Sequence, residues 1–215
     1  MYREIINGGS LQLINKSLWK LKLPLKVKVF LWFLHRGVIL TKDILVRRNW
    51  HGNEKCCYCS NNETIQHLFF ECHMARLIWR IIHTTFGLKK PNNVIHMFGT
   101  WLQGIRWKEK SLILTGVGAV CWAMWLSRND ILFDKVNPQP CLQILFRATY
   151  WIRFWALLQK EEDKITISEN CRVLESIAME IFARNGWRFS NRDFVYNKLF
   201  AKFSFFSLHI IASLL

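Results

Sequence analysis

Four potential metal ligands, Cys56, Cys59, His67 and Cys72, lie close together in the chain with the spacing C-x2-C-x7-H-x4-C. Three thiols and one imidazole form the ligand set of a tetrahedral structural zinc site. Four protein ligands leave no coordination position for water or substrate, so such a zinc would hold the fold together and perform no chemistry. The motif therefore favours a binding or architectural module. The alternative is a loop of ordinary reduced cysteines.

The spacing within the motif also constrains the backbone. His67 and Cys72 are five residues apart, and on an ideal helix their side chains would diverge by about 140°. The motif predicts that the helix is distorted here or that it begins between the two ligands. Cys57 forms only C-x-C with Cys59, which is the wrong reach for a shared ion, so we expect it to be a bystander. His73 would need a shift of register to bind.

The composition predicts a substantial buried core. Apolar residues make up 51% of the 215 residues, with 11 Trp and 16 Phe, far too many for a disordered chain. Helical spacing predominates, which predicts a mainly α fold with a small zinc-stabilised helical module followed by a Trp-rich helical region. The expected segments are a zinc-binding domain over 18–86, a linker over 87–110, a helical region over 111–194, and an unassigned apolar tail over 195–215.

Individual helices are expected from apolar periodicity and from capping residues. Pro24 suits the first turn of a helix that ends near Gly37, and Thr41 suits the cap of a short helix reaching Asn49. The linker is expected to have little regular structure. Further helices are predicted to leave the zinc motif, to cover 111–133 and 141–160, and to run from a cap at Ser168 to Gly186. The charged run 161–164, which begins with three acidic residues, is expected to mark a break.

Positive charge is concentrated ahead of the metal motif. The chain carries a net charge of +15, and residues 1–55 contain 11 Lys/Arg against 3 Asp/Glu. Such a field favours polyanions, and we expect RNA or DNA as the partner; a basic surface without a dedicated partner is the alternative. The candidate phosphate contacts are Lys20, Lys22, Lys26, Lys28, Arg36, Lys42, Arg47 and Arg48. The aromatic side chains that would stack on unpaired bases, if exposed, are Trp19, Trp32, Trp50 and Tyr58.

The remaining cysteines and the longest apolar run bear on location. Seven widely or irregularly spaced cysteines and no secretory signal at the N-terminus favour a reducing compartment, the cytoplasm or the nucleus. Residues 111–127 carry no charge, but they include two glycines and are barely long enough to span a bilayer. A buried core helix is the favoured interpretation, so a membrane is not the expected partner.

Three sequence runs together resemble a known family. They are LWKLKLPLKVKVFLWFLHR from Leu18, LTKDILVRRNW from Leu40, and the Cys/His motif continued to Trp79. They are similar to the zinc-binding domain of plant LINE-type (non-LTR) reverse transcriptases. The resemblance covers 18–86, and 121–133 and 186–192 look like the C-terminal extension of such polyproteins. It implies that Cys56, Cys59, His67 and Cys72 bind a structural Zn2+. Glu63, Leu68 and Phe69 match recurrent positions, with no catalytic role expected for Glu63.

Catalytic patterns are absent from the sequence. There is no Asp-Asp pair of the kind that holds two metals in a polymerase, no convergent set of carboxylates for an endonuclease or RNase H, and no phosphate-binding glycine loop. We therefore expect a non-catalytic, nucleic-acid-binding module derived from a retrotransposon polyprotein and lacking its polymerase. The alternatives are a helical interaction module that self-associates through its Trp-rich helices, and a decaying open reading frame without selected function.

Overall fold

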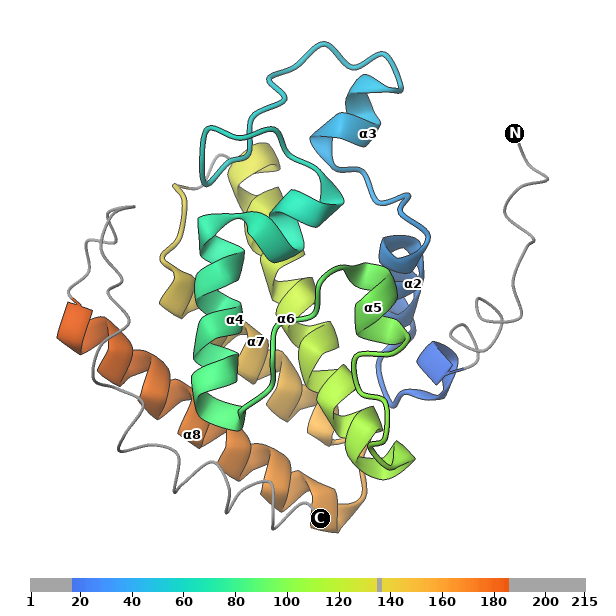
Figure 1. Ribbon diagram of the computed structural model, residues 1–215, viewed down its shortest axis with the longest axis vertical. Coiled ribbons are helices and arrows are strands. Elements are labelled where there is room, and N and C mark those ends of the chain that lie inside the picture. The colour runs from blue at the N-terminus through green and yellow to red at the C-terminus, as the bar shows by residue number, and fades with distance from the viewer. Residues whose placement is uncertain (1–16, 135–136, 186–215) are drawn as a thin grey trace.

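Helices form nearly all the regular structure of residues 17–134 and 137–185, which are the residues described by the computed structural model (Figure 1). Within those ranges the one pairing of extended segments is an isolated antiparallel bridge between Lys55 and Asn62. The mainly α prediction is confirmed. The tail 195–215 lies outside the described residues. The helices are α2 (Leu25–His35), α3 (Lys42–Val46), the π-helix η2 (His67–Glu71), α4 (His73–Phe86), α5 (Val94–Phe98), α6 (Trp107–Phe133), α7 (Cys141–Ala156) and α8 (Glu161–Asn185).

The first two helices begin where their capping residues predict. α2 starts directly after Pro24, and the chain leaves it through Gly37 at a φ of +69°, a conformation that glycine adopts without strain. α3 starts after Thr41 but ends at Val46, earlier than expected. The Thr41 hydroxyl donates to a carboxylate oxygen of Asp43 (2.6 Å) instead of accepting from the helix backbone.

Two stretches are more helical than the sequence indicated. The segment 87–110 contains α5, whose first turn is capped by the Asn93 side chain, and the start of α6 at Trp107. α8 begins at Glu161, so the acidic run forms its first turn and Ser168 lies inside the helix. Carboxylates are favourable there because the N-terminal turn carries partial positive charge. The charged residues that suggested a break therefore begin a helix.

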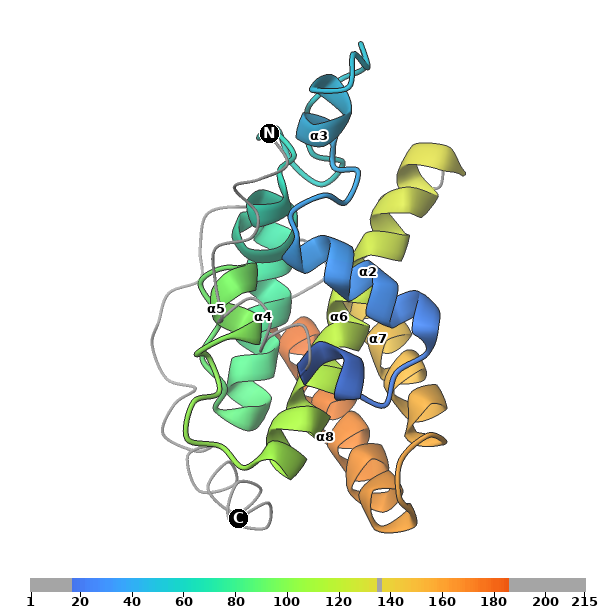
Figure 2. The same cartoon turned by 90° about the vertical axis from the view of Figure 1, so that its right-hand side faces the viewer.

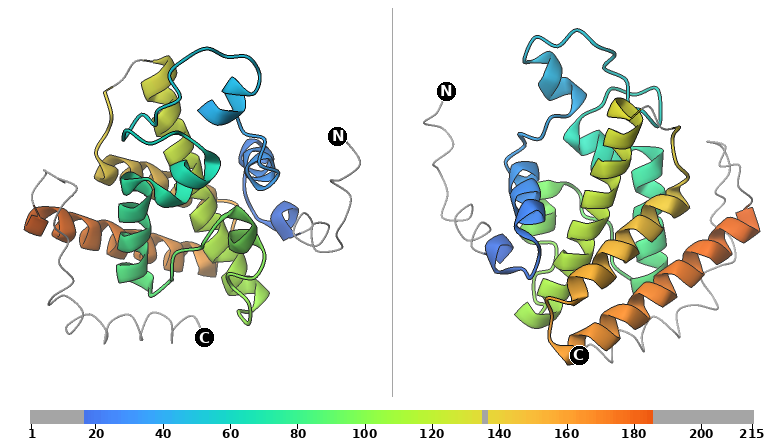
Figure 3. Two further views of the ribbon diagram at one scale, coloured as in Figure 1. Left: turned by 45° about the horizontal axis from the view of Figure 1, so that its top comes forward. Right: turned by 180° about the vertical axis from the view of Figure 1, so that it is seen from behind.

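α6 runs through the middle of the helical assembly. α2 crosses it on one side (Figure 2), and seen from behind, α7 packs on α6 with α8 beside α7 (Figure 3, right). α8 also packs against α4. Gly118 of α6 permits the close approach of α2, since a Cβ at this position would lie 3.0 Å from Leu31 Cδ1.

Side chains from both predicted segments share one buried cluster. Leu31, Phe69 and Trp79 precede residue 87, whereas Trp122 and Trp155 belong to α6 and α7, and all five are buried in the same core. The Trp79 indole donates to the carbonyl of Phe69 (2.8 Å), so the polar edge of this buried ring is satisfied. The segment predicted as the zinc-binding domain, 18–86, is thus packed directly on the Trp-rich helices. The proposed domain boundary itself stays a prediction.

By length and composition alone, α6 could cross a membrane. It is 27 residues long, and 61% of its most apolar window is buried inside the protein. A buried core helix can have the same length and composition, so these two properties are weak evidence of a membrane span.

A buried ion pair links the metal loop, residues 54–66 ahead of η2, to α6. Glu63 and Arg128 are 0% and 1% exposed, and the Arg128 guanidinium donates to Glu63 Oε1 from Nη2 (2.6 Å) and from Nε (3.1 Å). The same carboxylate accepts the backbone N–H of Lys42 at the start of α3 (3.0 Å). Arg128 Nη2 also donates to the carbonyl of Leu40 (3.2 Å). One pair therefore connects the metal loop, the start of α3 and α6.

We expect Arg128→Met to destabilise the protein strongly, by about 3–5 kcal/mol, because it leaves the Glu63 carboxylate buried without its counter-charge. The double variant Glu63→Met/Arg128→Met should lose much less than the sum of the two single variants, since no uncompensated charge remains. Urea denaturation measures both. The control is Arg47→Met, which removes an exposed pair with Asp43 and should change stability by no more than about 0.5 kcal/mol. An Arg128→Met effect as small as that of the control would contradict the assignment.

His35 is a second buried polar residue, and it lacks partners. Its side chain is 7% exposed at the end of α2, and neither ring nitrogen has a hydrogen-bond partner. The ring lies edge-on to Phe98 of α5, with centroids 5.9 Å apart. Burial, and secondarily the charge of Arg36, lower the pKa of His35. The folded protein therefore holds this imidazole in its neutral form.

Protonation of His35 should destabilise the fold at acid pH. Because the folded pKa is below the unfolded value of about 6.5, the unfolded chain binds a proton more readily, and stability falls as the pH drops below about 6.5. His35→Leu should lack this component, so its stability should rise relative to the wild type between about pH 7.5 and pH 5. Denaturation at each pH, with zinc content checked, measures the difference. A constant difference across this range would show that His35 does not titrate on unfolding.

Candidate metal centre

The first pair of candidate ligands lies in a tight turn between α3 and η2. The Cys56 N–H donates to the carbonyl of Asn61 (2.8 Å), and the Glu63 N–H donates to the carbonyl of Glu54 (2.9 Å). These two bonds flank the bridge between Lys55 and Asn62 and close the chain on itself. The turn brings Cys59 back toward Cys56, as a C-x2-C pair requires.

The second pair is positioned by the distortion that its spacing predicts. His67 begins the π-helix η2, in which the Cys72 N–H donates to the carbonyl of His67 (2.7 Å), an i to i+5 bond. Cys72 itself is extended (φ −54°, ψ 142°), and α4 begins at the next residue. The wider helical turn and the extended residue bring both side chains to the same side. Of the two predicted solutions, the distorted helix occurs; the α-helix α4 begins after both ligands and not between them.

The structure brings all four candidate ligand atoms together. They lie within 4.8 Å of one another, with Cys56 Sγ 3.9 Å from Cys72 Sγ and Cys59 Sγ 3.1 Å from His67 Nε2. Cys56, His67 and Cys72 are buried, and Cys59 is half-buried. The cluster is thus enclosed on most sides by protein.

These distances suit zinc. Zn–S bonds of about 2.3 Å in a tetrahedron place two sulfurs about 3.8 Å apart, close to the separation of the Cys56 and Cys72 sulfurs. With a Zn–N bond of about 2.0 Å, a sulfur and an imidazole nitrogen would be about 3.5 Å apart, so Cys59 and His67 need to separate only slightly. Three sulfurs and one nitrogen leave no open position. The site can therefore hold a metal, but no coordination position is left at which a substrate could bind.

The thiols differ in how easily they ionise. Hydrogen bonds from the thiols of Cys57 and Cys72 lower the pKa of Cys56, and the same interaction, together with burial, raises the pKa of Cys72. Burial raises the pKa of Cys59. The protein surroundings alone therefore favour one thiolate. Three thiolates side by side require a cation, which a divalent metal supplies.

The two neighbouring residues with metal-binding side chains differ in position. Cys57 forms a second group of possible ligands with Cys56 and Glu63. Hydrogen bonding to Cys56 and burial raise the Cys57 pKa, and Glu63 is already paired with Arg128, so this group is a poor competitor. His73 is exposed at the start of α4 and is not in either group. The four residues of the motif remain the best ligand set.

Most of the predicted basic contacts lie on the surface. Five side chains are exposed and two are half-buried, the exposed ones being Lys20, Lys22, Lys26, Arg47 and Arg48 and the half-buried ones Lys28 and Arg36. Lys42 differs from the prediction. It is 5% exposed, and its ammonium group donates to the carbonyl of Lys55 inside the fold. This lysine stabilises the metal loop and is not available to a phosphate.

The candidate stacking residues are unequally accessible. Trp19 and Trp50 are 42% and 39% exposed. Trp50 rests on Gly52, where any Cβ would collide with its ring. Trp32 is half-buried beneath Arg36, whose guanidinium carbon lies 5.5 Å from the ring centroid, and Tyr58 is packed against the core. Trp19 and Trp50 are therefore the two with open faces.

Sequence reasoning missed Arg128, which holds the metal loop in place. The sequence signal for its role was that Arg128 directly follows the uncharged run 111–127 within the same predicted helix. Its partner Glu63 lies between the two ligand pairs, where the resemblance placed a recurrent residue without a role. The distance along the chain between the two charges gave no hint of their contact.

Comparison with known proteins supports the metal assignment for the first third of the chain. Residues 1–79 match the family described as zinc-binding in reverse transcriptase, a range that contains all four candidate ligands. No curated protein and no solved structure matches the chain.

We expect the purified protein to contain one zinc per chain, measured by elemental analysis. Cys59→Ser should lose the metal and unfold at lower denaturant concentration, because metal binding and folding are coupled in such sites. Cys57→Ser is the matched control, since it removes a neighbouring thiol outside the ligand set, and it should retain both zinc and stability. A folded, zinc-free wild type, or equal zinc loss in both variants, would contradict the ligand assignment.

Proposed function

We propose that the chain is a non-catalytic, zinc-stabilised module that binds RNA or DNA. The observation that carries the proposal is the concentration of basic residues on α2, α3 and their flanking loops. Residues 17–48 contain eight Lys/Arg and a single acidic residue, Asp43. Seven of the eight basic side chains are at least partly accessible. Such a surface suits phosphate groups, which supply most of the affinity in sequence-independent binding.

The metal centre would support this surface without touching the nucleic acid. α3 follows α2 closely, and its first N–H is bound by Glu63 of the metal loop. The buried Lys42 ammonium ties α3 to Lys55 in the same loop. Zinc would therefore fix the direction of Arg47 and Arg48 at the end of α3. Trp19 and Trp50, at the two ends of the basic segment, are available to stack on unpaired bases.

The match over residues 1–79 supports an origin in a reverse transcriptase. We infer that the module derives from a plant LINE-type retrotransposon polyprotein, that this region itself carries no polymerase activity, and that it resides in a reducing compartment, the cytoplasm or the nucleus. A role without chemistry agrees with a metal site that has no open position. Buried free thiols in α6 and α7 agree with that compartment.

One observation favours self-association as a second candidate function. α7 and the residue that follows it expose a row of large apolar side chains about one helical turn apart, with Phe146, Tyr150, Phe154 and Leu157 between 37% and 67% exposed. An apolar stripe of this kind is typical of a protein contact. Concentration-dependent sedimentation would reveal it, whereas a monomer at all concentrations would remove this candidate.

Binding to single-stranded RNA and DNA oligonucleotides should weaken steeply with salt. Each phosphate contact contributes about −0.7 to the slope of log K against log salt, so Lys20→Ala/Lys22→Ala should make the slope about 1.4 less steep. Arg76→Ala/Arg172→Ala, which removes two exposed charges on α4 and α8, is the matched control and should leave the slope unchanged. Absence of binding at low salt, a slope near zero, or an equal effect of both pairs would refute the proposal.

A further inference from the structure

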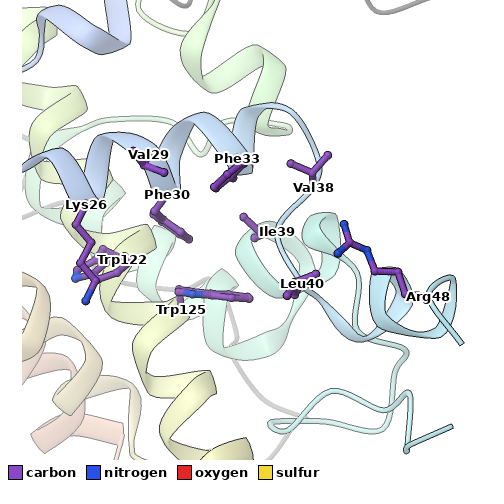
Figure 4. Close-up of a pocket in the computed structure, with 10 residues that line it drawn as sticks. All are labelled: Lys26, Val29, Phe30, Phe33, Val38, Ile39, Leu40, Arg48, Trp122 and Trp125. Atoms are coloured by element: carbon purple, nitrogen blue, oxygen red, sulfur yellow. The ribbon is translucent and has the colours of Figure 1, made fainter. Parts of the chain in front are cut away.

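An open apolar groove lies between α2 and α6 (Figure 4). It encloses about 450 Å³, within the range of sites that bind small ligands or side chains of a partner. The loop after α2 forms the third side of the groove. Arg48, which follows α3, lies at one end of it. The side chains that form its apolar surface include Phe30, Phe33, Val38, Leu40, Trp122 and Trp125.

The groove has a buried floor and an exposed apolar rim. Phe30 and Trp122 are 6% and 7% exposed and belong to the core, whereas Phe33, Val38 and Leu40 are each about two-fifths exposed. Three large apolar side chains converging on one groove leave apolar area in water, which a partner would remove. From Lys26 to Phe33 the groove follows α2 over seven residues, or about 10 Å, the length of roughly two helical turns.

A cation stands at each end of the groove, and neither is neutralised. Lys26 lies over the Trp122 ring, with Nζ 5.5 Å from the centroid, and Arg48 lies at the opposite end (Figure 4). Among the described residues, neither forms an ion pair with a carboxylate. Every other groove-lining residue is apolar. The groove therefore combines an apolar surface with positive ends.

We propose that this groove binds an amphipathic helix of a partner protein, one that carries apolar side chains along one face and acidic side chains toward its ends. About two turns of helix fit along α2, which suits apolar residues at i, i+3 or i+4, and i+7. The carboxylates of the partner helix pair with Lys26 and Arg48. The net charge of +15 attracts such a segment over longer distances.

The apolar lining favours a protein partner over a nucleic-acid base. Between the two cations the groove side chains offer a base only the indole N–H donors of Trp122 and Trp125, so most polar edge groups of an inserted base would be buried without a partner, which is unfavourable. Leu, Ile, Val and Phe side chains incur no such cost. The inference goes beyond nucleic-acid binding. It shares Lys26 and Arg48 with the candidate phosphate contacts, but Lys20, Lys22 and Arg47 lie outside the groove lining, so the two kinds of binding can be tested with different variants.

Selection from a displayed library of random peptides on the full-length, zinc-loaded chain tests the inference. We expect enrichment of peptides with the i, i+3 or i+4, i+7 apolar pattern and with Asp or Glu near the ends. Fluorescence polarisation of a selected peptide should show at least tenfold weaker binding to Phe33→Asp and Leu40→Asp. Phe154→Asp is the matched control, since it places the same charge on an exposed aromatic of α7, and it should bind like the wild type.

Reversing the charge at each end of the groove tests the electrostatic contribution to peptide binding separately from the apolar contribution. Lys26→Glu and Arg48→Glu should weaken the acidic peptide several-fold, whereas Arg172→Glu, an exposed cation on α8, should not. Circular dichroism and zinc content confirm folding, and Arg48→Glu and Leu40→Asp serve if Phe33→Asp fails to fold.

Three results would overturn the inference. The first is a library that yields no such peptides, or peptides that bind Phe33→Asp and Leu40→Asp as well as the wild type. The second is loss of oligonucleotide binding in both groove variants without any peptide selected, which would assign the groove to nucleic acid. The third is a wild-type dimer that Leu40→Asp converts to a monomer, which would assign it to a second copy.

Discussion

The buried pair of Glu63 and Arg128 is the interaction on which the arrangement of the described chain depends. Both charges are removed from water, and a buried charge is tolerable only when it is paired and hydrogen-bonded. Here one carboxylate satisfies the guanidinium and the first N–H of α3, while the guanidinium also binds the carbonyl of Leu40. These hydrogen bonds are directional. Both buried charges are therefore satisfied only when α3, the metal loop and α6 have the relative positions seen here.

The local features of the site were predictable because they depend on short stretches of sequence. The ligand set follows from the types and spacing of four residues. The five-residue interval between His67 and Cys72 demanded a departure from an ideal helix, and the π-helix with an extended residue after it supplies one. The start of α2 follows from Pro24, and its exit follows from Gly37, whose positive φ other residues rarely adopt. In each case the physical constraint acts within one or two turns.

Features set by distant contacts were not predictable in this way. Glu63 and Arg128 are 65 positions apart, and nothing in the sequence near either residue identifies its partner. Lys42 belonged to a basic run that looked uniformly exposed, but the metal loop folds over it and buries its side chain. The start of α8 was misplaced because a run of acidic residues is equally compatible with a loop and with the first turn of a helix. Packing against α7 and α4, which no local pattern records, decides between them.

Metal binding and the apolar groove are therefore linked. Glu63 lies midway between Cys59 and His67, so the position of its carboxylate depends on the loop that zinc would close. That carboxylate orients Arg128, and Arg128 in turn binds the carbonyl of Leu40, a residue on the rim of the apolar groove. If the loop opened, Arg128 would lose its counter-ion inside the core and the rim would lose its anchor, a change much too costly to occur independently of the fold. A closed metal site without chemistry can in this way control the proposed binding surface, because it determines whether that surface exists.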